Sequence, residues 1–231
     1  PLERLKDLNI LDQNLTLTHS IYLNSDIKKE KYKREQLNIF SETKTNICHC
    51  PVVYLREGFG LNSYQLLVNS GINVGIGTDT VPPDMINEMQ ATSLLSKLKD
   101  DDSISGNPKD IYNSATIGGA KALNRNDIGR LQKGALADIV IINISNIRTG
   151  LVDDPIRSLV YYSNSKDIKT VIINGKTVLD NYKINNLDEN DLYSSAQYLW
   201  NKLISNKLLN VKNSSSKNTF KIMRQQYKKN I

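Results

Sequence analysis

The sequence predicts an α/β protein in which a parallel sheet is followed by a small antiparallel β unit. Up to about residue 125, short apolar runs alternate with helical patterns, the order expected of parallel strands joined by helices. Further on, two β-rich runs flank Asn174-Gly175, a dipeptide that favours a type I′ hairpin turn. We therefore expect three regions, at 1–125, 126–183 and 184–231.

In the first region, three apolar runs predict strands at 15–19, 46–50 and 74–79. The segments between and after them predict helices at 26–40, 61–69 and 84–99, with one more beginning at Pro108 behind an Asn107 cap. The 84–99 helix is expected to bury apolar residues at helical spacing, namely Met85, Met89, Leu94, Leu95 and Leu98. Gly118-Gly119 falls within a helical pattern, where close packing is the simplest explanation.

The second and third regions have a different character. Strands are predicted at 137–142, 170–173 and 176–179, and a helix at 189–205. The Asn/Lys/Ser-rich tract at 212–218 is expected to be disordered.

Charge and composition exclude several classes of protein. The 231 residues carry a net charge of +6, and seven Lys or Arg with no acidic residue lie between 206 and 231. A solvated basic tail explains this better than a nucleic-acid surface, since aromatic residues for stacking are sparse. No apolar run approaches the roughly 20 residues of a membrane span, and no signal peptide is recognisable. With only two cysteines, too close for an ordinary structural bridge, we expect a cytoplasmic protein.

Two polar side chains end predicted strands. The run Val74-Gly75-Ile76-Gly77-Thr78-Asp79 is an apolar strand that finishes in a carboxylate, and His19 ends the strand at 15–19. In one parallel sheet both would reach the same carboxyl-terminal edge, where α/β enzymes place their sites. The alternatives are a hydrogen-bonded His19 at the sheet edge and an Asp79 that caps the following turn.

The segment Cys48-His49-Cys50 looks like a metal cluster, but strand geometry argues against it. Successive side chains of a strand point to opposite faces, so the two cysteines share one face and His49 takes the other. His49 alone could still line a pocket, because Pro51 ends the strand directly after it.

Taken together, these segments resemble the amidohydrolase superfamily, in its metal-dependent chlorohydrolase and deaminase branch. Thr18-His19 is similar to the sixth-strand His motif, the HCP of 49–51 to the seventh-strand segment, and the GTD of 77–79 to the eighth. Further similar segments follow in the family's order, at 114–123, 128–138 and 154–176. The resemblance covers about 10–205 and implies the C-terminal part of a (β/α)8 TIM-type barrel, with strands six to eight, plus part of a small β-sandwich domain.

The resemblance also implies a chemistry. Asp79 would bind a divalent metal, usually Zn²⁺, and accept a proton from the attacking water, and His19 would orient that water or polarise the substrate. The implied reaction is hydrolysis of a non-peptide carbon–nitrogen bond, such as deamination of a heterocycle or cyclic amidine. Tentative lining residues for this small-molecule substrate are His49, Tyr54, Thr80 and Met85.

Part of the family pattern is missing from this chain. The first-strand His-x-His pair and the fifth-strand His are absent, which makes the chain resemble the C-terminal half of a longer enzyme. We therefore expect a missing N-terminal half or a partner chain, and weak metal binding by the isolated chain. A homodimer is common among similar proteins. The alternatives are a non-catalytic half that acts as a scaffold or assembly subunit and, more weakly, a basic-tailed nucleic-acid binder.

Overall fold

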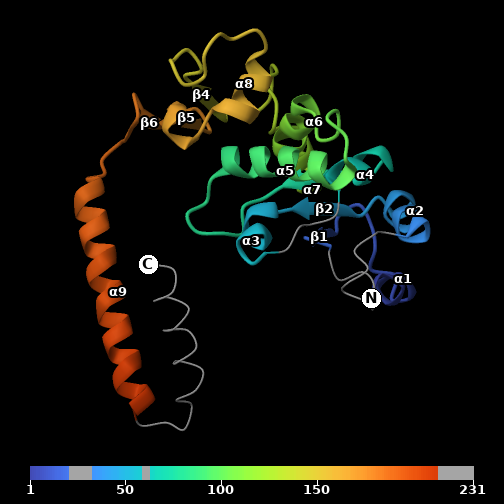
Figure 1. Cartoon of the computed structure of the whole chain (residues 1–231), viewed down its shortest axis with the longest axis horizontal. Coiled ribbons are helices and arrows are strands. Elements are labelled where there is room, and N and C mark those ends of the chain that lie inside the picture. The colour runs from blue at the N-terminus through green and yellow to red at the C-terminus, as the bar shows by residue number, and fades with distance from the viewer. Residues whose placement is uncertain (21–32, 59–62, 213–231) are drawn as a thin grey trace. The chain divides into compact units, whose positions relative to one another are not determined.

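The computed structural model describes residues 1–20, 33–58 and 63–212, with side chains up to residue 205. It divides into two compact units, Pro1–Lys183 and Ile184–Ile231. The first unit holds the strands β1 to β6 with their helices, and the second holds the long helix α9 (Glu189–Lys212), which extends the predicted 189–205 helix (Figure 1). Among the described residues, no helix combines the length and apolar character needed to cross a bilayer.

Three parallel strands form the sheet that organises the first unit (Figure 1). They are β1 (Thr16–Thr18), β2 (Asn46–His49) and β3 (Val74–Ile76), in that spatial order, with Leu17 opposite Ile47 and Ile47 opposite Val74. The three predicted strands and their parallel arrangement are therefore confirmed, although each is shorter than predicted.

The helices between these strands are α2 (Arg34–Thr43), α3 (Pro51–Arg56) and α4 (Tyr64–Asn69). The predicted helices at 26–40 and 61–69 correspond to α2 and α4, and their first residues lie outside the described part of the chain. Helix α3 was not predicted. Pro51 ends the strand as expected, but it also occupies the first turn of this helix, where its missing N–H costs nothing.

The main core lies between one face of this sheet and the surrounding helices. Since Ile47 pairs with Val74 and His49 with Ile76, these four side chains share one face, and Cys48 and Gly75 take the other. The core on the first face is completed by helix residues that are less than a tenth exposed, including Leu37, Phe40, Tyr64, Leu67, Met89 and Ile111. The Tyr64 hydroxyl is satisfied inside it by the Asp110 carbonyl and the Ser114 hydroxyl.

Helix α5 (Met85–Asp100) forms where predicted, with the Asp84 carboxylate accepting hydrogen bonds from two backbone N–H groups of its first turn. The prediction of its buried face was partly wrong. Met89 and Leu95 are buried, whereas Leu94 and Leu98 are 53% and 80% exposed. The buried stripe instead contains Glu88, Thr92, Ser93 and Ser96, polar residues whose small size or internal hydrogen bonds permit close packing.

The segment after α5 contains further short helices. They are α6 (Pro108–Asn113), the π-helical turn η1 (Ser114–Gly118) and α7 (Gly119–Ala122). The Asn107 side chain caps α6 by accepting from the Asp110 N–H, as the sequence predicted. Besides α3, two more helices were not predicted, α1 (Leu2–Asp7) and α8 (Pro155–Tyr162), the second capped by Asp154.

A second, antiparallel sheet follows in the order β4 (Ile139–Ile142), β5 (Ile168–Ile173), β6 (Lys176–Asp180) and β7 (Lys183–Ile184), with the 3₁₀ turn η2 (Ser165–Asp167) before β5. The predicted hairpin is confirmed. Asn174 and Gly175 join β5 to β6 with φ of 49° and 75°, the two positive values that a type I′ turn requires.

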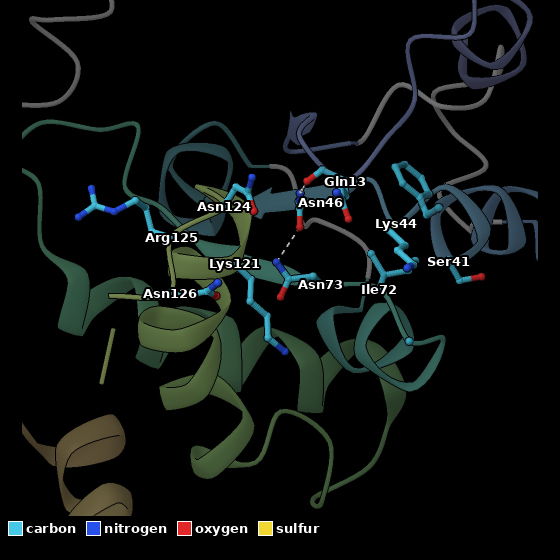
Figure 2. Close-up of a pocket in the computed structure, with 12 residues that line it drawn as sticks. Gln13, Ser41, Lys44, Asn46, Ile72, Asn73, Lys121, Asn124, Arg125 and Asn126 are labelled. Carbon is cyan, nitrogen blue, oxygen red and sulfur yellow. Dashed lines mark hydrogen bonds between the residues drawn. The ribbon is translucent and has the colours of Figure 1, made fainter. Parts of the chain in front are cut away.

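Two asparagines tie the amino ends of the parallel strands together. The Asn46 side chain donates to the backbone carbonyls of Gln13 and Leu15, and the Asn73 side chain donates to the Asn46 amide oxygen (Figure 2). Asn73 also donates to the Gly118 carbonyl, which links the sheet to η1. These bonds fix the strands at the edge opposite to the predicted site.

Gly118 packs closely against β3, which supports the interpretation of Gly118-Gly119 as a packing feature. A Cβ at Gly118 would lie 2.5 Å from the Val74 carbonyl oxygen, whereas a Cβ at Gly119 would meet nothing within 4 Å. Both glycines have ordinary helical backbone angles, so only the available space distinguishes them.

These neighbours give a matched pair of substitutions. Gly118→Ala should lower the free energy of unfolding by about 1–3 kcal/mol, because the methyl forces the helix away from the strand. Gly119→Ala should be neutral or raise it by up to about 1 kcal/mol, since alanine is the better helix former. Urea denaturation of the two variants checks this, and equal effects at both positions would contradict the close contact.

Candidate active site

His19 and Asp79 meet at the carboxyl-terminal edge of the parallel sheet. His19 Nε2 lies 3.1 Å from Asp79 Oδ2, a contact between residues 60 positions apart in sequence. The His19 side chain is 15% exposed and that of Asp79 is 60% exposed. The pair expected from the strand ends is therefore formed, with the imidazole packed into the protein and the carboxylate open to solvent.

The backbone beyond the strands positions this pair. The His19 N–H donates to the Cys48 carbonyl and the Gly77 N–H to the His49 carbonyl, so the ladder continues past the last strand residues. His19 and Asp79 then adopt positive φ values of 63° and 39°. Such values are uncommon for residues with a side chain, and His and Asp tolerate them better than most. The sharp turns direct both side chains to the same point.

Tyr54 completes a small cluster on α3. Its ring meets the His19 ring edge to face, with centroids 4.7 Å apart. The His19 Nδ1 atom is buried and has no hydrogen-bond partner among the described residues. His19 is thus held by one aromatic contact and one carboxylate.

Two further predicted pocket residues, Thr80 and Met85, follow Asp79 in the chain. Thr80 follows Asp79 and accepts a hydrogen bond of 2.6 Å from Arg56, which also donates to the Val81 carbonyl. Met85 opens α5 and is 37% exposed. Arg56 was not predicted, yet it holds the loop after Asp79 to α3.

The structure does not bring His49 to the exposed pair. Its side chain is 2% exposed and faces the helices, with its ring 6.1 Å from that of Tyr64. Burial lowers the pKa of His49 to about 4, helped by the nearby His19. His49 is therefore a neutral imidazole in the core, and its Nε2 has no partner among the described residues.

Glu88 is a buried carboxyl group that the sequence analysis missed. Its side chain is 0% exposed, and Oε2 accepts a hydrogen bond of 3.1 Å from the Val52 N–H. Burial raises the pKa of Glu88 to about 7, and the Val52 hydrogen bond and nearby Arg56 offset only part of that effect. The only sequence signal is its helical spacing with buried Thr92 and Leu95, on a face predicted to be apolar.

The donor atoms at the edge fit only part of a metal site. Asp79 offers an exposed carboxylate and His19 an imidazole, both ordinary zinc ligands. A protein zinc site needs three or four ligands, and no group of three candidate ligands occurs among the described residues. A metal at Asp79 would therefore require ligands from residues beyond these.

A cavity of about 290 Å³ lies at the opposite edge, beside the Asn46–Asn73 pair (Figure 2). It is lined by residues from the amino ends of the strands and by Lys44, Lys121 and Arg125. None of the predicted site residues lines it, so the chemistry-bearing pair and this cavity are separate features.

Glu88 gives a testable pH dependence of stability. Between about pH 4.5 and 7 the folded chain keeps the Glu88 proton that the unfolded chain has lost, so this group's contribution to the free energy of unfolding falls as the pH rises. Glu88→Gln cannot titrate. The free energy of unfolding of the wild type minus that of the variant should therefore decrease by at most about 3 kcal/mol as the pH rises across this window. Urea denaturation at several pH values checks this, and a difference that stays constant would contradict the raised pKa.

The chain is similar in sequence to deaminases. The chain is 34% identical over 165 residues to a 5-methylthioadenosine/S-adenosylhomocysteine deaminase of Pelotomaculum thermopropionicum, covering 70% of this chain and 38% of that protein. It is 28% identical over 201 residues to a 5′-deoxyadenosine deaminase of Methanosphaera stadtmanae, covering 85% and 45%. The chain thus spans less than half the length of these curated relatives.

Solved structures show the same partial coverage. An adenosine deaminase from Xanthomonas campestris with bound zinc superposes with a TM-score of 0.81 at 25% identity, over 89% of this chain and 46% of that one. The zinc complex of an atrazine chlorohydrolase from Arthrobacter aurescens gives 0.75 at 23%, over 86% and 43%. The chain therefore shares part of the amidohydrolase barrel fold. The sequence model of the amidohydrolase family matches residues 1–178, most of the chain, and the protein belongs to that family.

Proposed function

We propose that this chain is the C-terminal portion of a metal-dependent hydrolase that removes an amino group from a heterocycle, with water as the second substrate. The observation that carries the proposal is the His19–Asp79 contact of 3.1 Å at the carboxyl edge of the sheet, in a chain of the amidohydrolase family. That edge is where barrel enzymes place their reactive groups.

The finer architecture belongs to the same proposal. Strands β1, β2 and β3 would be the sixth, seventh and eighth strands of a (β/α)8 barrel within a 1–125 region. The β4–β6 sheet would be part of a composite sandwich within 126–183. The coverage of the solved structures supports this architecture. The chain matches 43–46% of the length of those proteins, which is less than a full barrel with its second domain.

Asp79 would carry the proton transfers. Hydrolytic deamination adds water to the carbon that bears the amino group and releases ammonia, so a proton must move from the water to the leaving nitrogen. An exposed carboxylate that contacts both groups can accept and then deliver that proton. His19, fixed by Tyr54 and by Asp79, would orient the water or polarise the substrate.

Zinc is the cofactor proposed for the complete site, with Asp79 as the one ligand supplied by the described residues. A bound zinc ion lowers the pKa of water to about 7 and so provides hydroxide at neutral pH. The remaining ligands would come from residues beyond this chain's described part. The bound zinc of the Xanthomonas campestris deaminase supports this assignment.

The substrate class follows from the relatives. Their names cover adenosine, 5′-deoxyadenosine, 5-methylthioadenosine and S-adenosylhomocysteine, all of which carry the same 6-amino purine. We therefore propose a 6-aminopurine nucleoside with a variable 5′ substituent as the substrate.

The first experiment is the intact mass of the polypeptide that the native cell produces, with zinc measured on the same sample. A species near twice 26.0 kDa with about one zinc per chain and ammonia release from 6-aminopurine nucleosides is expected. A 26.0 kDa species without zinc and without deaminase activity would overturn the proposal and favour a scaffold or assembly role.

Substitution of Asp79 tests its role in the active, native-length protein. Asp79→Asn should reduce kcat by about 10²–10⁴-fold, because the amide cannot accept the proton. It should also lower the zinc content, since a carboxylate ligand is lost. The matched control is Asp153→Asn, an exposed carboxylate that contacts Arg157 and the Asp154 N–H on the surface, which should leave both quantities unchanged. Equal activity in the Asp79 variant would contradict the assignment.

A further inference from the structure

The two cysteines lie together on the sheet face opposite to His49. Cys48 Sγ and Cys50 Sγ are 3.7 Å apart, and neither is in a disulfide. Cys48 is partly exposed, while Cys50 is 1% exposed. The pair is therefore reachable from the Cys48 side and is held by the protein on the Cys50 side.

The neighbouring strand leaves room for these sulfurs. A Cβ at Gly77 would lie 2.7 Å from Cys48 Sγ, closer than real Cβ atoms approach, and 3.1 Å from Cys50 Sγ, a distance tighter than most real Cβ contacts. Any larger residue at this position would displace the two thiols. Gly77 thus keeps them side by side directly below the turn that carries Asp79.

We propose that Cys48 and Cys50 form a dithiol site that binds one thiophilic metal or metalloid centre for which two thiolate ligands are enough. A trivalent arsenical represents this class of ligand. The site involves neither His19 nor Asp79 as a ligand, so it stands whether or not the chain is part of a hydrolase.

The sulfur separation fits bonding to a common atom. An atom about 2.3 Å from each sulfur, the usual zinc–thiolate distance, would form an angle of about 107° across a separation of 3.7 Å, close to the tetrahedral value. No third candidate ligand completes the pair in the described part of the chain. This favours ions for which two thiolates suffice over zinc, which needs three or four protein ligands in a stable site.

The state of the thiols also supports binding. The hydrogen bond with the Cys50 thiol lowers the pKa of Cys48 to about 7, so a fraction of Cys48 is thiolate at neutral pH. The same contact raises the pKa of Cys50. Cys48 therefore supplies the nucleophilic thiolate that forms the first bond, and the Cys50 thiol can form the second.

The binding step balances without an oxidant. With phenylarsine oxide, each sulfur forms a bond to arsenic, the arsenic–oxygen bond breaks, and the oxide leaves as water with the two thiol protons. Arsenic remains trivalent and no electrons are transferred.

The test is a titration of the reduced full chain with phenylarsine oxide, followed by intact mass and free-thiol counting. Because the chain contains only two cysteines, no other thiol competes. The expected product is one phenylarsenic group per chain with loss of two hydrogens, no free thiol, and reversal by excess dithiol. Adducts at one cysteine only, or chains cross-linked through arsenic, would overturn the proposal.

Two comparisons show whether the fold builds the site. A synthetic peptide of residues 45–53 contains both thiols without the sheet, and the folded chain should bind at least tenfold tighter. Equal affinity would overturn the proposal, and this comparison needs no variant. Gly77→Ala keeps both cysteines but intrudes on the sulfurs, so it should weaken binding several-fold, whereas Cys48→Ser or Cys50→Ser should abolish dithiol capture. Unchanged affinity in Gly77→Ala would also count against it.

Discussion

The parallel pairing of β1, β2 and β3 is the constraint on which the rest of the molecule depends. Because the strands run in one direction, their carboxyl ends share an edge, and residues distant in sequence meet there. A slip of one residue between β2 and β3 would exchange the two faces of β2. It would turn His49 away from the core and turn both cysteine side chains toward the helices. The asparagine bonds at the amino edge and the close approach of Gly118 to β3 oppose such a slip.

The two faces of β2 have different chemical roles for this reason. On the helix-covered face, His49 stays neutral because burial lowers its pKa, and its ring packs beside Tyr64. On the other face, Cys48 and Cys50 lie beside a glycine instead of a bulky residue. Glu88 reaches the same neighbourhood from α5 and holds the first turn of α3 through Val52. Helix α3 in turn carries Tyr54 against His19, so a buried carboxyl group supports the orientation of the exposed pair.

The elements predicted correctly are those with strong local signals. Asn107 before Pro108 and Asn174-Gly175 each determine backbone geometry within a few residues, and both behave as predicted. The pairing of His19 with Asp79 could be predicted because parallel strands end at a common edge. The buried face of α5 could not, because Ser93, Ser96 and Glu88 are buried by tertiary contacts that their residue types do not indicate. The role of Arg56 depends in the same way on α3, a helix that was not predicted because Pro51 indicates only the end of the strand.

The edge carries two donor pairs of different chemical character. His19 and Asp79 offer nitrogen and oxygen, which suit zinc, whereas Cys48 and Cys50 offer two sulfurs, which suit softer ions. The pairs are adjacent, since the His19 N–H donates a hydrogen bond to the Cys48 carbonyl. The nearby Asp79 charge acts to raise the pKa of both thiols. For Cys48, the hydrogen bond with Cys50 outweighs this effect, and the pKa is lowered. Each pair contributes two potential ligands, fewer than a closed zinc site requires. The 60% exposure of Asp79 leaves its oxygens open to further ligands, whereas the buried Cys50 restricts its site to what Cys48 can admit. The softness of the donor atoms and their exposure to solvent therefore favour different ions at the two pairs.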